Sequence, residues 1–147
     1  MNKLLVFILG CVLLFGCGQK EEKQNQDTQK NEQAEQSALK SAESWLVYID
    51  DGKYGESWDA AASLFKNALP REKWEELMNN TRSAAGKFLE RKVLSKTFKT
   101  TLPGAPDGQY VVIQFQTKFE QKEYAIETVT PTMDADSTWR VSGYYIK

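Results

Sequence analysis

Residues 110–119 read YVVIQFQTKF, and this stretch decides the fold class. One alternate set of its residues is mostly apolar and consists of Val111, Ile113, Phe115, Thr117 and Phe119. The residues between them are mostly polar. A period of two is typical of a β-strand that buries one face. The stretch therefore predicts a strand of an antiparallel sheet covered on one side, with Phe115 in the core.

Three further strands are predicted around this one, at residues 88–100, 123–132 and 139–146. Short segments rich in turn-forming residues separate the four strands, at residues 102–108, 120–122 and 134–137. In the strand at 88–100 neither alternate set is cleanly apolar. We therefore expect that strand to be bent or to lie at an edge of the sheet.

Simple alternation in the last strand places Val141 and Tyr145 on one face, and Arg140 and Tyr144 on the other. We expect most of the aromatic residues of the chain to be core residues, because they fall on the apolar faces of predicted elements. Tyr144 is the exception, since it faces away from Tyr145.

The segment before the sheet has helical periodicity, with predicted helices at residues 37–49, 54–67 and 70–85. Gly52 ends the first helix, Pro70 opens the third and Gly86 stops it. Trp58 falls on the apolar face of the second helix, so we expect it to be buried. The predicted fold class is α+β, with three N-terminal helices packed on a curled four-stranded antiparallel sheet in a single domain over residues 37–147.

The first 17 residues have the layout of a secretory signal. Lys3 precedes an apolar run at residues 4–15, and the run closes on LFGC at residues 14–17. This ending resembles a bacterial lipobox, which implies a signal peptide at residues 1–16 and a Cys17 that carries acyl chains such as palmitate. Two alternatives stay open: a secretory signal with a free Cys17, and a membrane-spanning helix, for which 12 apolar residues are too few.

Residues 18–36 read GQKEEKQNQDTQKNEQAEQ and contain no large apolar side chain. Such a segment buries too little surface to offset its ordering entropy, so we expect residues 17–36 to be an acylated cysteine followed by a disordered tether. The expected location is the cell envelope, lipid-anchored outside the cytoplasm. Gly18 after the cysteine implies the outer membrane if the source has one.

The composition excludes several classes of function. The chain has 19 Lys and Arg residues against 20 Asp and Glu residues, so nothing in its charge indicates a nucleic-acid partner. It has no histidine, which removes the usual nucleophilic triads and the commonest metal ligand. We expect no metal, no cofactor and no enzyme activity. The expected partners are the membrane, through the lipid anchor, and an envelope protein or a small ligand.

Three phrases of the sequence are similar to one known family. They are WLVYIDDGKYGESW at residues 45–58, LPGAPDGQY at residues 102–110 and WRVSGYY at residues 139–145. Together they resemble the bacterial domain-of-unknown-function family 4019 (DUF4019), an uncharacterised family that implies little about activity. The order of helices and strands is also similar to the nuclear transport factor two-like, cystatin-like fold. That resemblance implies a cone with an internal pocket, but the fold serves both enzymes and binding modules.

Glu127, Arg140 and Tyr144 are the candidate ligand-binding residues, and no catalytic residue is assigned. Glu127 and Arg140 lie mid-strand in consecutive strands, so they could face each other on the concave side of the cone or form an ion pair on the outer face. Asp50 and Asp51 end a helix, where negative charge is unfavourable, so they indicate either a cation or partner contact or a solvated turn.

The favoured function is a membrane-tethered binding or assembly module for a protein partner or small ligand. The alternative is an enzyme that uses carboxylate or tyrosine acid–base chemistry in a cone-shaped pocket, with Glu127 as the base. The binding-module hypothesis predicts that Glu127→Gln folds normally.

Overall fold

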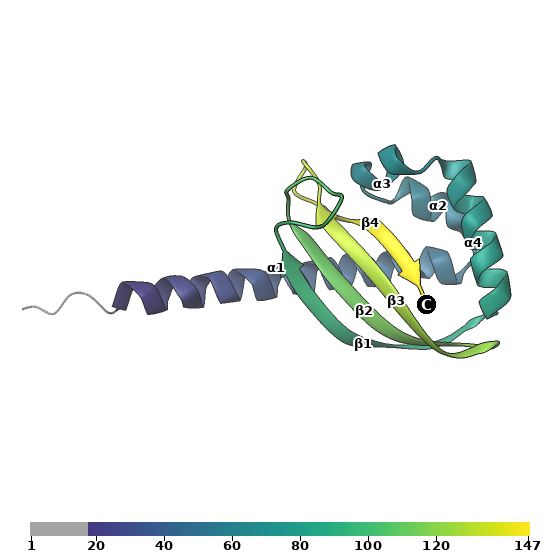
Figure 1. Ribbon diagram of the computed structural model, residues 1–147, viewed down its shortest axis with the longest axis horizontal. Helices are drawn as coiled ribbons and strands as arrows, with labels where there is room; N and C mark the ends of the chain where they lie inside the picture. The colour runs from purple at the N-terminus through teal and green to yellow at the C-terminus, as the bar shows by residue number, and fades with distance from the viewer. Residues whose placement is uncertain (1–17) are drawn as a thin grey trace, which may run out of the picture.

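The computed structural model describes residues 18–147, which form one four-stranded antiparallel sheet and four helices. The strands are β1 (Phe88–Lys99), β2 (Tyr110–Phe119), β3 (Lys122–Met133) and β4 (Trp139–Ile146), in the spatial order β1-β2-β3-β4. Figure 1 shows the sheet with the helices gathered on one of its faces. The predicted α+β class and the antiparallel sheet are confirmed. The signal peptide and the lipid site at Cys17 lie outside the described residues.

The burial pattern of β2 follows the alternation of its sequence. Val111, Ile113, Phe115, Thr117 and Phe119 are all buried, and the residues between them are exposed or half-buried, except for Tyr110, which is also buried. Phe115 packs in the main core together with Trp45 and Trp74 from the helices. As predicted, β1 lies at an edge of the sheet, and the register of its pairing with β2 shifts between Val93 and Ser95. Edge strands commonly carry such irregularities.

The helical layer consists of α1 (Gly18–Asp50), α2 (Tyr54–Asp59), α3 (Ser63–Ala68) and α4 (Arg71–Ala85). Helix α1 contacts all four strands. Its buried residues Ala38, Ala42, Trp45, Leu46 and Ile49 form one apolar face, at the helical spacing on which the prediction of a helix at residues 37–49 rests. Within residues 18–147, no helix combines the length and the apolar character that crossing a membrane requires.

The single helix predicted at residues 54–67 is instead two short helices. Ala62 has an extended backbone, with φ −63° and ψ 154°, and its N–H donates to the carbonyl oxygen of Val141 at 2.8 Å. The chain therefore leaves the helical conformation at Ala62 and forms a hydrogen bond to the edge strand β4 instead. Trp58, predicted to be buried, is only partly so, and its indole N–H donates to the Leu69 carbonyl oxygen at 2.7 Å.

Helix α1 begins at Gly18, where the sequence predicts a disordered tether up to residue 36. The physical reason lies in helix propagation, because adding a residue to an existing helix is far easier than starting one. Glu, Lys and Gln are good helix formers, and the packed half of α1 supplies the nucleus. Figure 1 shows this N-terminal half extending well beyond the sheet, and its side chains at residues 24–30 are exposed.

A bulge in β4 reverses the predicted alternation. Thr130 pairs with Gly143 whereas Pro131 pairs with Val141, so β4 contains one extra residue at this point. Val141 and Tyr144 consequently both face the helices, and the prediction that Val141 and Tyr145 share a face is wrong. Tyr145 is 53% exposed, whereas the Tyr144 ring lies 5.6 Å from Trp45 and 6.1 Å from Trp74.

Replacing Phe115 with alanine tests the core. Phe115 is 1% exposed in the centre of the sheet, so Phe115→Ala is expected to lower the free energy of unfolding by about 3–5 kcal/mol. Urea denaturation of purified protein measures this loss. The matched control is Val47→Ala, because Val47 is 56% exposed on α1 and its truncation should change stability by less than about 0.5 kcal/mol. Equal losses in the two variants would contradict this assignment of the core.

Candidate functional site

Four charged side chains meet between the helices and the sheet. They are Asp50 from the end of α1, Arg82 from α4, Arg91 from β1 and Glu127 from β3, and together with Thr117 and Tyr144 they form what we term the buried charge cluster. Glu127 is 0% exposed, and the side chains of Arg82 and Arg91 are 5% and 11% exposed. Charged groups are buried this deeply only when they are paired and hydrogen-bonded.

Glu127 accepts three hydrogen bonds. Its Oε2 receives them from Arg91 Nε at 2.7 Å and from the Thr117 hydroxyl at 2.5 Å, and its Oε1 receives one from the Tyr144 hydroxyl at 2.5 Å. The strand register explains this geometry, because Phe115 lies opposite Glu127 and Thr117 is two residues further along the same face of β2. The two carboxylate oxygens of Glu127 therefore accept hydrogen bonds from side chains on three different strands.

Asp50 connects the two arginines. Its Oδ1 accepts from Arg82 Nη2 at 2.9 Å and from Arg91 Nη2 at 3.0 Å, while its Oδ2 accepts from Arg91 Nη1 at 2.8 Å. The contact with Arg91 is bidentate, the arrangement that suits a planar guanidinium and a carboxylate best. Of the two alternatives for Asp50, a cation contact or a solvated turn, the structure supports the first, and the cations are the chain's own arginines.

The cluster is electrically neutral, with two arginines against two carboxylates. Aromatic rings cover the guanidinium groups: the Arg82 Cζ lies 4.5 Å from the centre of the Phe119 ring, and the Arg91 Cζ lies 4.4 Å from that of Phe88. One donor is left over, because Arg82 Nη1 is buried without a hydrogen-bond partner in the described part of the chain. It lies 3.6 Å from Glu127 Oε1, within ion-pair range.

Burial and the neighbouring charges shift two pKa values in the cluster. Burial of the Tyr144 hydroxyl raises its pKa well above the ordinary value, and the adjacent Glu127 carboxylate raises it further. Burial alone would lower the pKa of Arg91, but its hydrogen bonds to Asp50 and Glu127 and their charges outweigh that effect and raise it. Tyr144 is therefore neutral and Arg91 charged at physiological pH.

This geometry favours a structural role for Glu127 over a role as a catalytic base. A general base must reach the proton that it abstracts, directly or through one water. Glu127 has no exposed surface, and both its oxygens already accept hydrogen bonds. Its carboxylate joins β1, β2, β3 and β4, so it acts as a connection inside the sheet.

The structure brings together two of the three predicted site residues. Glu127 and Tyr144 are hydrogen-bonded, but Arg140 lies opposite Thr132, far along the strand from Glu127, whose partner in β4 is Ile146. The proposed pairing of Glu127 with Arg140 is wrong. Arg140 instead binds Asp134 at 3.1 Å and Asp136 at 2.8 Å, and its hydrogen bonds lower the pKa of Asp136 to about 2.

Arg82 and Arg91 were missed as site residues, although the sequence holds a signal for the first. Trp74, Met78 and Ala85 mark the buried side of α4, and Arg82 falls on that same side. A charged residue on the apolar face of a helix indicates a buried partner. Arg91 has no comparable signal, because β1 is irregular and most of its residues are exposed.

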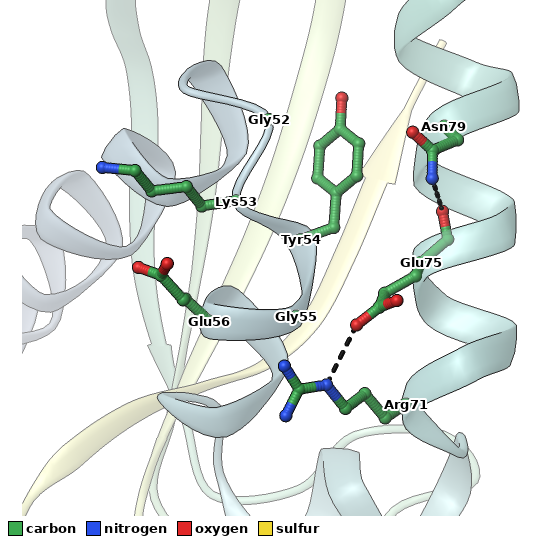
Figure 2. A pocket seen from close by; sticks show the side chains of 8 residues that line it. All are labelled: Gly52, Lys53, Tyr54, Gly55, Glu56, Arg71, Glu75 and Asn79. Carbon is green, nitrogen blue, oxygen red and sulfur yellow. Dashed lines mark hydrogen bonds and ion pairs between the residues drawn. The ribbon is translucent and has the colours of Figure 1, made fainter.

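A surface pocket of about 250 Å³ lies between the α1–α2 turn and α4 (Figure 2). A Cβ at Gly55 would lie 2.3 Å from Arg71 Nη2, so a larger residue there would displace the flexible Arg71 side chain. The two basic residues that line the pocket already have acidic partners on the protein. Arg71 binds Asp59 and Glu75, each at 2.9 Å, and Lys53 binds Asp51 at 3.2 Å. In residues 18–147, no three His, Cys, Asp or Glu side chains gather as a metal site requires.

The buried charge cluster predicts that Glu127→Gln destabilises the protein, which revises the expectation from the sequence. Removing this charge leaves Arg82 and Arg91 with one carboxylate between them, and breaking a buried pair costs about 3–5 kcal/mol. Urea denaturation at pH 7 measures the loss. Arg140→Gln is the matched control, because Arg140 is 32% exposed in its ion pairs with Asp134 and Asp136 and its loss should cost less. A Glu127→Gln variant as stable as wild type would contradict the structural role.

The raised pKa of Tyr144 predicts a loss of stability in alkali. Only the folded state raises this pKa, so the stabilisation is complete below the ordinary value of 10.0 and is lost as the pH rises toward the folded value. Above pH 10.0 the unfolding free energy of wild type should fall faster than that of Tyr144→Phe, by up to about 1.4 kcal/mol per pH unit. Tyr54, whose pKa burial also raises, is present in both proteins. Parallel pH profiles would refute the effect.

Comparison with known proteins identifies the family and nothing beyond it. Neither the curated proteins nor the solved structures contain a match to this chain. The likeness to the nuclear transport factor two-like fold therefore stays a prediction. One family model, described as a protein of unknown function (DUF4019), matches residues 41–144. This range includes every member of the buried charge cluster and all of α2, α3, α4, β1, β2 and β3. The chain belongs to the DUF4019 family.

Proposed function

We propose that this protein is a bacterial envelope lipoprotein, tethered outside the cytoplasm through Cys17, whose domain is a binding or assembly module for another envelope molecule. The observation that carries the proposal is the neutral and hydrogen-bonded state of the buried charge cluster. Catalytic groups need shifted pKa values together with access to a substrate. Glu127, the strongest candidate base, has no exposure, so the groups best suited to chemistry are occupied in holding the fold together.

The form of α1 supports a tethered module. A helix rises 1.5 Å per residue, so residues 18–36 span about 30 Å from the predicted lipid site to the packed domain. Because the same helix continues into the core, it would hold the domain at a defined distance from the membrane. The remaining details of the predicted fold, a curled sheet and a cone of the cystatin-like type, are part of this proposal, and the bulges in β1 and β4 support curvature.

Metabolic labelling with a fatty-acid analogue tests the anchor. Wild type should incorporate the label and partition with membranes, whereas Cys17→Ala should do neither. The chain offers a matched control in Cys11, the other cysteine, which lies in the predicted signal peptide. Cys11→Ala should be labelled like wild type. Equal labelling of Cys17→Ala and wild type would refute the lipoprotein proposal.

Crosslinking in the intact envelope tests the binding role. Wild type should yield discrete crosslinked species that Cys17→Ala, released from the membrane, yields in smaller amounts. If the two proteins gave only the uncrosslinked chain at matched expression, the binding-module proposal would fail.

A further inference from the structure

The surface pocket between the α1–α2 turn and α4 is surrounded by more negative than positive charge. Its lining includes the basic residues Lys53 and Arg71. Four carboxylates either line the pocket with them or form ion pairs with them, namely those of Asp51, Glu56, Asp59 and Glu75. Two positive charges against four negative ones leave a net charge of −2, which attracts cations and repels anions.

The charges around the pocket are unevenly paired. Arg71 is shared between two carboxylates, each at 2.9 Å, so it has one more acidic partner than neutrality requires. Lys53 pairs with Asp51 at 3.2 Å, and the hydrogen bond and charge of Asp51, followed by the charge of Glu56, raise the pKa of Lys53. Within residues 18–147, Glu56 forms no ion pair of its own. Its carboxylate is therefore the group in this pocket best placed to receive a cation from outside.

Tyr54 and Gly55 give the pocket its shape. The Tyr54 ring packs against the main core and lines the pocket, and an aromatic ring attracts a cation placed over its face. Figure 2 shows Arg71 and Glu75 reaching from α4 toward Gly55, where no side chain stands in their way. The volume of about 250 Å³ lies below the range of drug-sized sites, so the pocket suits a small molecule.

The pocket lies at the end of α1 that is distant from the predicted lipid site. Helix α1 has 33 residues, which corresponds to a length of about 50 Å. Figure 1 shows the α1–α2 turn at the opposite end of this helix from its N-terminus. In the tethered arrangement proposed above, the pocket is held away from the headgroups of the anchoring membrane. A water-soluble ligand fits this position better than a lipid headgroup does.

We propose that this pocket binds a small, water-soluble organic cation that carries a primary ammonium group. The inference rests on the proposed binding function and names a class of ligand for it. The carboxylates of Glu56 and Glu75 would accept the hydrogen bonds of the ammonium group, and the Tyr54 ring would add a cation–π contact.

Titration of the full-length chain in detergent, followed through its amide NMR signals, tests this site. The probe is the diamine putrescine, and butanediol and succinate are the neutral and anionic controls with the same number of carbons. Putrescine should shift the signals of residues 52–56, 71, 75 and 79 in a saturable way, and the controls should not. Glu56→Gln should weaken the apparent affinity about twofold to fivefold, as expected for an exposed charge pair. Glu72→Gln, which removes an exposed charge of α4 outside the pocket, should leave the affinity unchanged.

Three results would overturn the proposal. They are an absence of saturable shifts with putrescine, equal shifts with butanediol or succinate, and equal weakening by Glu56→Gln and Glu72→Gln, which would reduce the effect to general charge attraction. Each would leave the binding module standing if discrete crosslinked species still form in the envelope. Failure of this site is therefore distinguishable from failure of the proposed function.

Discussion

The pairing of Asp50 and Glu127 with Arg82 and Arg91 joins the helices and the sheet through buried charges. Asp50 ends α1, Arg82 lies on α4, Arg91 on β1 and Glu127 on β3, so one cluster links four elements of the fold. Taking charges out of water costs several kcal/mol per ion, and good geometry must repay that cost. In this cluster three kinds of contact offset the desolvation cost. They are the bidentate pair of Arg91 with Asp50, the three hydrogen bonds to Glu127 and the aromatic rings that cover both guanidinium groups.

This arrangement changes where function is to be sought. The space between a helical layer and a sheet is one place where a protein can hold a ligand. Here Trp45, Trp74 and Tyr144 pack together beside the charge cluster and occupy the space between α1, α4 and the sheet. On the surface of the sheet, the edge strand β1 carries three exposed apolar residues, Leu89, Val93 and Leu94. Two residues separate β1 from α4, and β1 contributes Arg91 to the cluster, so its position is held by the same contacts.

The sequence predicted those features that depend on local periodicity. The alternation in β2, the apolar face of α1 and the turns between strands are set by neighbouring residues, and all appear in the structure. The features that depend on distant partners were missed. The Ala62 contact with β4 divides a predicted helix, and the β4 bulge turns Tyr144 inward. Glu127 and Tyr144 could be chosen as candidate site residues from the sequence of their own strands. Their pairing with Arg82 and Arg91 could not be predicted, because it depends on how α4 and β1 lie in space.

A double-mutant cycle on Arg91 and Glu127 tests most directly the claim that the buried charge cluster holds the fold together. Free energies of unfolding would be measured for wild type, Arg91→Leu, Glu127→Leu and the double variant. The account predicts that the double variant is far more stable than the sum of the single losses implies, with a coupling of about 2–3 kcal/mol, because each single change leaves the buried cluster with one unbalanced charge whereas the double change keeps it neutral. A matched cycle on Glu127 and Arg140, which do not touch, should be additive. A coupling below about 0.5 kcal/mol between Arg91 and Glu127 would contradict the account.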